Sequence, residues 1–129
     1  MLEEDALRTL WIGAAGFVGA IARYGVDGWV MRRTAGAFPW GTLVVNATGC
    51  FALGVLFTVL TERILPHPTL RAALTIGLLG AYTTFSTFSL ETVRLIEDGA
   101  MLMAAGNVVA SLGLGIASVY AGIFLGRAI

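Results

Sequence analysis

The chain has 129 residues, of which 57% are hydrophobic and only 12% charged, and it carries no formal net charge at pH 7. A soluble domain has about a quarter charged residues. This deficit favours a protein of the lipid bilayer, and the lack of a basic patch argues against nucleic acid as a partner.

Four apolar runs follow one another along the chain, covering residues 10–31, 41–60, 70–90 and 101–125. Each approaches or exceeds the ~20 residues that cross a ~30 Å hydrocarbon core. The sequence therefore predicts an all-α membrane protein, a single four-helix transmembrane domain over residues 1–129 with both termini on one side. The acidic start at Glu3–Asp5 differs from the basic beginning of a cleaved signal peptide, so we expect the first run to remain as a span.

The first helix is expected from near Ala6 to about Arg32, with Gly16, Gly19 and Arg23 along one face. An ionisable residue within a span usually faces the protein interior or a wet cavity. Arg23 could draw anions into a vestibule, or its long side chain could reach the membrane surface. The spacing leaves both roles open.

The second helix is expected to begin after Phe38-Pro39-Trp40, since proline suits a helix start and aromatic rings suit the headgroup boundary. It should end near Glu62–Arg63. Thr42 and Asn46 lie one turn apart on it. Thr42 could bond back to the backbone, whereas the deeper Asn46 has donors that could hold an anion or join two helices.

The third helix, expected from near Thr69 to Glu97, contains the most informative segment of the chain. Five hydroxyls fall within residues 83–89. Lipid cannot satisfy them, so this stretch must face protein, water or an ion. Upstream, Gly77 and Gly80 would tolerate an unwound turn, whose bared carbonyls would suit a hard cation such as Na⁺.

Phe85, Phe88 and Glu91 share one face of the same helix. Phenylalanines at this spacing usually belong to a core, but these two lie between hydroxyls, and the positive edge of an aromatic ring can meet an anion. Glu91 could be part of an ion pathway or could bond to Thr87 or Thr92. We favour the structural role.

The fourth helix carries a stripe of small and polar residues on one face, formed by Asn107, Ser111, Gly115, Ser118, Gly122 and Gly126. The glycines indicate a seam of close helix packing, with a GxxxG at its end. The Asn107 amide and the Ser111 hydroxyl need polar partners at depth. They could therefore line a path for an ion.

Orientation and catalysis leave few signals in the sequence. Four arginines are expected at one end of the bundle and three at the other, so the positive-inside rule gives only a weak bias. Either a small bias fixes the orientation or copies insert both ways.

His67, the only histidine, lies in a Pro-His-Pro turn, and no metal cluster or phosphate loop is present in the sequence, so an enzyme is not expected.

Three segments together resemble the Fluc (CrcB) family of fluoride channels: residues 77–92, 40–46 and 107–111. The resemblance covers essentially the whole chain. It implies an antiparallel (dual-topology) homodimer in the bacterial plasma membrane, with four transmembrane helices per subunit and the third broken mid-membrane. Such a dimer exports toxic cytoplasmic fluoride passively through two pores.

The resemblance also implies roles for individual residues. The backbone carbonyls of Gly80 and Thr83 in both subunits would hold a structural Na⁺ at the dimer interface, and Arg23 would lie at the aqueous vestibule. Some family members have tyrosine where this chain has Asn107. The candidate fluoride pathway comprises Phe85, Phe88, Asn46, Ser111, Thr42, Asn107, Arg23 and Glu91.

Two alternatives belong to other classes. A small multidrug-type proton-coupled antiporter also has four helices and dual topology, but its mechanism requires an acidic residue in mid-membrane, typically in the first helix, where this chain has Arg23. A non-transporting assembly protein would explain the small-residue seam of the fourth helix. It would not explain the Thr/Ser/Phe string of the third.

Overall fold

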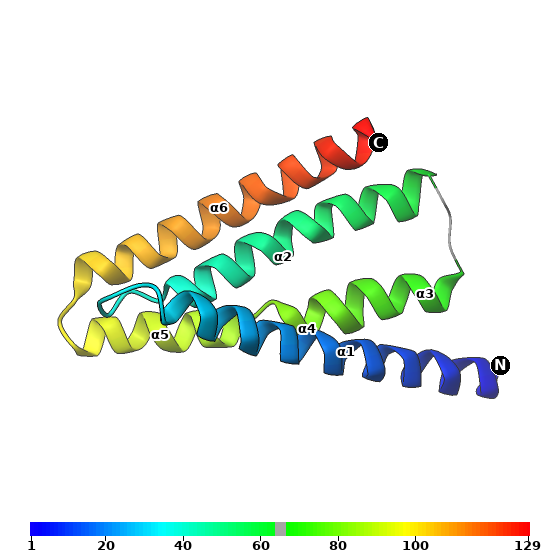
Figure 1. The fold of residues 1–129 in the computed structure, drawn as a ribbon, viewed down its shortest axis with the longest axis horizontal. Helices are drawn as coiled ribbons and strands as arrows, with labels where there is room; N and C mark the ends of the chain where they lie inside the picture. Colours follow the sequence, from blue (N-terminus) through cyan, green and yellow to red (C-terminus); the bar gives the residue numbers. More distant parts are fainter. Residues whose placement is uncertain (64–66) are drawn as a thin grey trace.

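The computed structural model describes residues 1–63 and 67–129, and its elements are helical throughout (Figure 1). Its first two helices are α1 (Leu2–Met31) and α2 (Trp40–Thr58), the second continuing as the π-helical η1 (Val59–Arg63). The third span consists of α3 (Pro68–Ala72), the π-helical η2 (Ala73–Leu79), α4 (Gly80–Tyr82) and α5 (Phe85–Glu97), and α6 (Met101–Ala128) completes the fold. Both termini lie at the end opposite the α1–α2 and α5–α6 connections.

Four helical stretches are long and apolar enough to cross a membrane: Glu3–Met31, Trp40–Glu62, Pro68–Glu97 and Met101–Ala128. The prediction of an all-α chain with four spans is therefore confirmed. The first helix begins at Leu2 rather than near Ala6. Glu3, Glu4 and Asp5, which lie before the predicted start, occupy the first turn of this helix. There the positive end of the helix dipole stabilises their negative charge.

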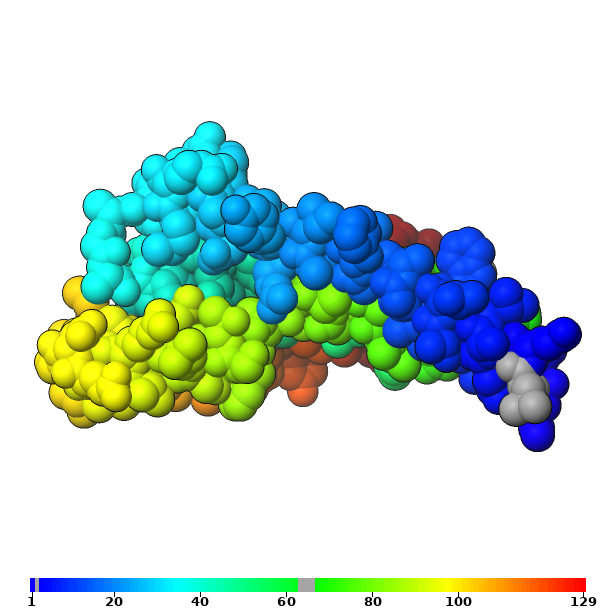
Figure 2. Space-filling view, turned by 90° about the horizontal axis from the view of Figure 1, so that it is seen from below, coloured from blue at the N-terminus to red at the C-terminus, as the bar shows by residue number. Residues whose placement is uncertain are grey.

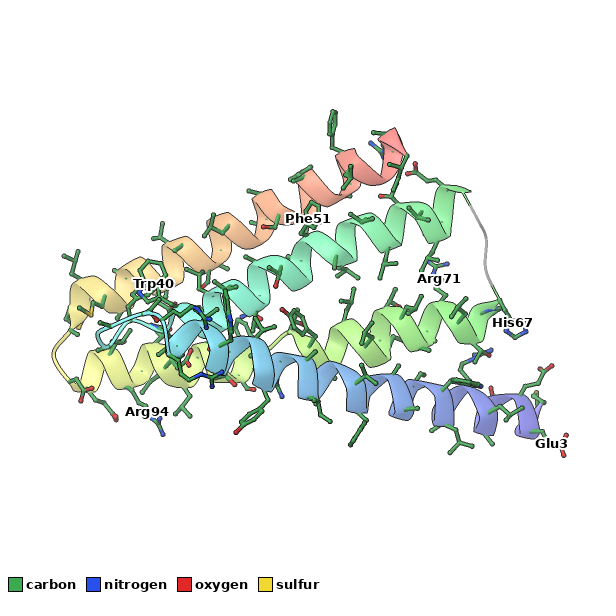
Figure 3. The ribbon with its side chains drawn as sticks, viewed as in Figure 1. Glu3, Trp40, Phe51, His67, Arg71 and Arg94 are labelled. Carbon is green, nitrogen blue, oxygen red and sulfur yellow. The ribbon has the colours of Figure 1, made fainter. Side chains whose placement is uncertain are left out.

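The buried core combines apolar side chains such as Leu43 and Leu95 with the polar Thr42, Thr58 and Asn107, while many other large apolar side chains are exposed (Figure 3). Val45, Asn107 and Thr58 are the largest side chains that are fully buried, whereas Leu102 and Phe124 are 88% and 78% exposed. A water-soluble fold shows the reverse pattern. The arrangement suits a protein whose outer surface contacts lipid.

Glycines bring α2 and α6 into close contact. A Cβ on Gly54 would overlap the Val119 carbonyl, one on Gly122 would overlap the Phe51 carbonyl, and one on Gly126 would lie 2.9 Å from Thr58 Cβ. Backbones can approach this closely only where side chains are absent. The GxxxG seam predicted on the fourth helix therefore packs against α2.

The helix α1 lies along the third span and contacts η2 and α4 (Figure 2). Here again glycines make the contact, because a Cβ on Gly19 would overlap the Leu78 carbonyl and one on Gly77 would lie 2.5 Å from the Ile12 carbonyl oxygen. Gly77 thus serves helix packing, which requires it to stay helical.

The extended backbone of the third span lies at Thr83 (φ −83°, ψ 158°) and Thr84 (φ −150°, ψ 116°). Gly80, where an unwound turn was expected, is helical with φ −63° and ψ −37°. The backbone therefore leaves the helix not at Gly80 but three residues later, at Thr83. The reason is that side-chain hydrogen bonds, rather than glycine's conformational freedom, determine where this backbone leaves the helix.

Candidate functional site

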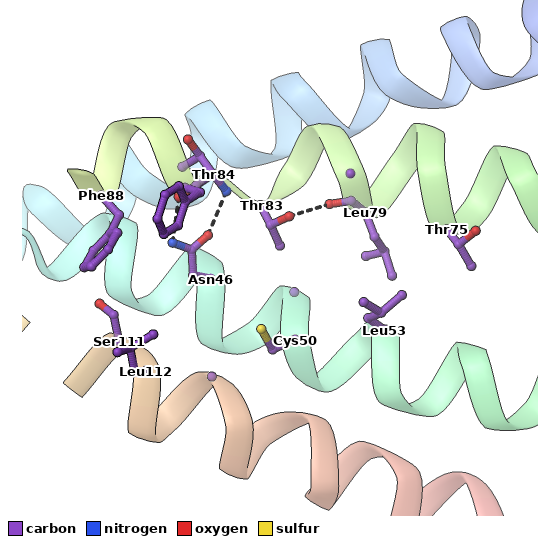
Figure 4. A pocket seen from close by; sticks show the side chains of 14 residues that line it. Asn46, Cys50, Leu53, Thr75, Leu79, Thr83, Thr84, Phe88, Ser111 and Leu112 are labelled. Carbon is purple, nitrogen blue, oxygen red and sulfur yellow. Dashed lines mark hydrogen bonds between the residues drawn. The ribbon is translucent and has the colours of Figure 1, made fainter. Parts of the chain in front are cut away.

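Asn46 of α2 holds the extended backbone of the third span. Its Nδ2 donates to the Thr84 carbonyl at 2.9 Å, and the Thr84 N–H donates to Asn46 Oδ1 at 2.8 Å (Figure 4). Of the two roles left open for Asn46, the structure shows the bond across a helix interface. An amide nitrogen carries two N–H groups, so one of them remains for a further acceptor.

The Thr84 side chain begins the next helix. Its hydroxyl oxygen accepts from the Thr87 N–H at 3.2 Å and the hydroxyl donates to Thr87 Oγ1 at 2.9 Å. In a continuous helix the N–H groups of Thr84 and Thr87 would bond to the carbonyls four residues earlier, those of Gly80 and Thr83. Both N–H groups are diverted to side chains, so these two carbonyls lose their usual partners.

Sequence reasoning did not assign a role to Thr84. One signal in the sequence could have indicated its role: Thr84 directly precedes an amphipathic run. Threonine is favoured at such a helix N-cap because its hydroxyl oxygen can accept a hydrogen bond from an N–H of the first turn.

A cavity of about 300 Å³ lies between the third span, α2 and α6. It brings together most of the residues predicted as a pathway and cation site: Asn46, Gly80, Thr83, Phe85, Phe88 and Ser111. The rings of Phe85 and Phe88 lie 5.5 Å apart between centroids and are tilted by 47°. Phe88 is buried, whereas Phe85 is 76% exposed in the single chain.

A second cavity of about 210 Å³ opens between α1, α2 and the third span. Arg23 and Thr42 line it, together with Tyr24 and Asp27, which sequence reasoning did not single out. Thr84 lines both cavities, so the extended segment stands between them. The place of Arg23 in a vestibule and its attraction of anions stay predictions.

Thr42 connects α2 to the third span at a buried position. Its hydroxyl donates to Glu91 Oε1 at 2.9 Å. Glu91 therefore has the structural bond that was expected, but from Thr42 rather than from Thr87 or Thr92. Thr87 is engaged by Thr84, and the Thr92 hydroxyl donates to the Phe88 carbonyl at 2.8 Å. The second oxygen, Glu91 Oε2, is buried without a hydrogen-bond partner in the described part of the chain.

Asn107 lies apart from both cavities. It is 0% exposed, and its Nδ2 donates to Thr92 Oγ1 at 2.9 Å. The Ser111 hydroxyl donates to Asn107 Oδ1 over a longer 3.4 Å. Ser111 therefore reaches the larger cavity, while Asn107 stands behind it and fixes α6 to α5.

Comparison with known proteins indicates the same family as the sequence resemblance. The family model described as CrcB-like protein, Camphor Resistance (CrcB), matches residues 10–123. Three similar curated proteins are each named fluoride-specific ion channel FluC. The one from Solibacter usitatus is 44% identical over 94% of this chain and 99% of its own length. The one from Geobacter sulfurreducens is 46% identical over 92% and 95%, and the one from Nitratidesulfovibrio vulgaris 45% over 90% and 94%.

Proposed function

Since this chain belongs to the CrcB family, we propose that it is a fluoride-specific ion channel, a multi-pass protein of the bacterial plasma membrane that exports fluoride passively. One observation carries the proposal. In a chain whose relatives are named as fluoride channels, two phenylalanine rings, an amide and a hydroxyl surround one cavity within the membrane-spanning region.

The chemistry of these groups fits a small, strongly hydrated anion. Removing water from fluoride is the main barrier to its passage, so a pathway must offer substitutes for that water. The second N–H of Asn46, the Ser111 hydroxyl, and the positive ring edges of Phe85 and Phe88 can supply them. None carries a full charge that would trap the ion, and conduction requires several weak sites.

The functional unit we propose is an antiparallel homodimer with two pores and a third helix broken mid-membrane. Phe85 is 76% exposed in the single chain although it belongs to a span. Ser86 beside it is exposed as well, and its hydroxyl has only a long 3.4 Å hydrogen bond, to Thr84 Oγ1. Lipid offers a polar group no further partner. A second copy would cover this face, and the weak charge bias between the two ends is compatible with opposite insertion.

We further propose that the carbonyls of Gly80 and Thr83, with those of the second copy, hold a structural Na⁺. The residues fit this role because the N–H groups that would normally bond to these carbonyls are bound by Asn46 and Thr84. Carbonyl oxygens are suitable ligands for hard cations. The ion would supply positive charge that binds carbonyls of both subunits together.

Fluoride efflux from liposomes loaded with fluoride tests the proposal. Phe85→Ile and Phe88→Ile should each slow efflux at least about tenfold, which corresponds to about 1.4 kcal/mol of lost ion stabilisation. Phe124→Ile is the matched control, because Phe124 is 78% exposed on α6. If both variants conducted at the wild-type rate, the ring-edge pathway would be wrong.

The same liposomes separate a channel from a small multidrug-type antiporter. The antiporter needs a membrane carboxyl that exchanges protons, and two residues could serve: Glu91, with its unpartnered Oε2, and Asp27 of α1, which lines the smaller cavity. A channel conducts fluoride in preference to chloride and without a proton gradient. Substrate movement that requires a proton gradient would favour the antiporter.

A further inference from the structure

The smaller cavity contains a charged residue that the proposed pathway does not use. Asp27 follows Arg23 by one turn of α1, and both line the cavity of about 210 Å³ with Thr42 and Thr84. Residues at this spacing commonly pair. No ion pair joins Arg23 to Asp27, however, within the part of the chain that the structure describes.

The Asp27 carboxylate lies instead against the beginning of α2. A Cβ built on Gly41, the second residue of that helix, would overlap Asp27 Oδ1 and lie 2.9 Å from Asp27 Cγ. The Gly41 N–H donates to Met31 Sδ at 3.4 Å, so Asp27 contacts the Cα side of Gly41 rather than a free N–H group. Asp27 therefore places a fixed negative charge beside α2, in the same cavity as Arg23.

We propose that Asp27 sets the rate of fluoride entry: its carboxylate lines the same cavity as Arg23 and lowers the fluoride concentration around that guanidinium at the mouth of the proposed pathway. The inference rests on the proposed channel function. Glu91, bound by Thr42, is the other carboxylate close to this mouth. Asp27 thus keeps Arg23 from holding fluoride too strongly, in line with the weak binding that conduction requires.

The expected effect follows from the charge alone. A unit charge roughly 6 Å from an ion in water changes the local ion concentration about threefold at low salt. Asp27→Asn keeps the size of the side chain and one acceptor oxygen, replaces the other oxygen by an NH₂ donor, and removes the charge. It should raise the initial rate of efflux at subsaturating fluoride by about this factor.

The experiment compares wild type, Asp27→Asn and Asp27→Glu in liposomes at ionic strengths of about 0.01 M and about 1 M, where the screening length falls from about 30 Å to about 3 Å. The gain of Asp27→Asn should be near threefold at low salt and disappear at high salt, while Asp27→Glu should match wild type. Size-exclusion chromatography establishes that each variant is folded.

Other results would overturn the inference. An Asp27→Asn rate at or below wild type in low salt would mean that the carboxylate only supports the fold, and a gain that salt leaves unchanged would mean that charge is not its cause. If Asp27→Asn did not fold, Arg23→Gln would give the converse test: slower efflux at low salt, converging on wild type at high salt. Absence of that convergence would overturn the inference. A wild type that conducts no fluoride would overturn the proposed function as well.

Discussion

Replacing Asn46 by alanine tests the central structural claim, that one side chain holds the extended backbone of the third span. The substitution removes two hydrogen bonds to a single residue, the 2.9 Å bond to the Thr84 carbonyl and the 2.8 Å bond from the Thr84 N–H. Both backbone groups then lack a protein partner, and the extended conformation offers them no helical alternative.

The magnitude follows from these two groups. A polar group left without a partner in a protein interior costs about 1–3 kcal/mol. Because Asn46 borders the cavity of about 300 Å³, water can reach the vacated position and offset part of this cost. We therefore expect Asn46→Ala to lower the free energy of unfolding by about 2–4 kcal/mol and to slow fluoride efflux.

Unfolding in mixed detergent micelles, titrated with a denaturing detergent, measures this difference. Thr48→Val is the matched control, because Thr48 also lies on α2 and shares a hydrogen bond of 2.8 Å with the Tyr82 hydroxyl, but at an exposed position. It should cost less than about 1 kcal/mol. An Asn46→Ala variant within about 0.5 kcal/mol of wild type would refute the claim that the amide fixes the break.

Two other substitutions test the packing and the polar contacts. Gly122→Ala should destabilise the fold by about 1–3 kcal/mol, because the added methyl overlaps the Phe51 carbonyl. Gly113→Ala, with nothing within 4 Å of the added methyl, should stabilise the helix by up to about 1 kcal/mol. Equal effects of the two would contradict the seam. Thr42→Val removes the hydroxyl bound to Glu91 and should slow efflux at least about tenfold, whereas Thr42→Ser should conduct normally. Fast efflux through Thr42→Val would remove this contact from the mechanism.

The spans could be predicted because lipid imposes a simple requirement. Four apolar runs of sufficient length leave few alternatives to four helices, and the structure begins and ends them close to the expected residues, for example at Trp40 and Glu97. The glycine seam was predictable for a similar reason. Residues such as Gly122 recur at helical spacing, and a close backbone approach is the common reason for that recurrence.

The break in the third span was harder to locate, because it depends on residues distant in sequence. Glycine's conformational freedom pointed to Gly77 and Gly80, yet the amide that stabilises the extended backbone belongs to Asn46, 38 residues before Thr84. No periodicity within the third span records that contact. The partner of Glu91 was missed for the same reason, since Thr42 lies 49 residues away.

The hydrogen bonds around the break give a physical reason to expect a second copy. Asn46 and Thr84 bind the N–H groups of Thr84 and Thr87, so the carbonyls of Gly80 and Thr83 are left as acceptors without their helical donors. Within a membrane such carbonyls must find partners in protein, water or an ion. Gly80 is exposed in the single chain, so water or an ion can reach it. The proposed Na⁺ shared with an opposing copy would meet this requirement, whereas lipid would not.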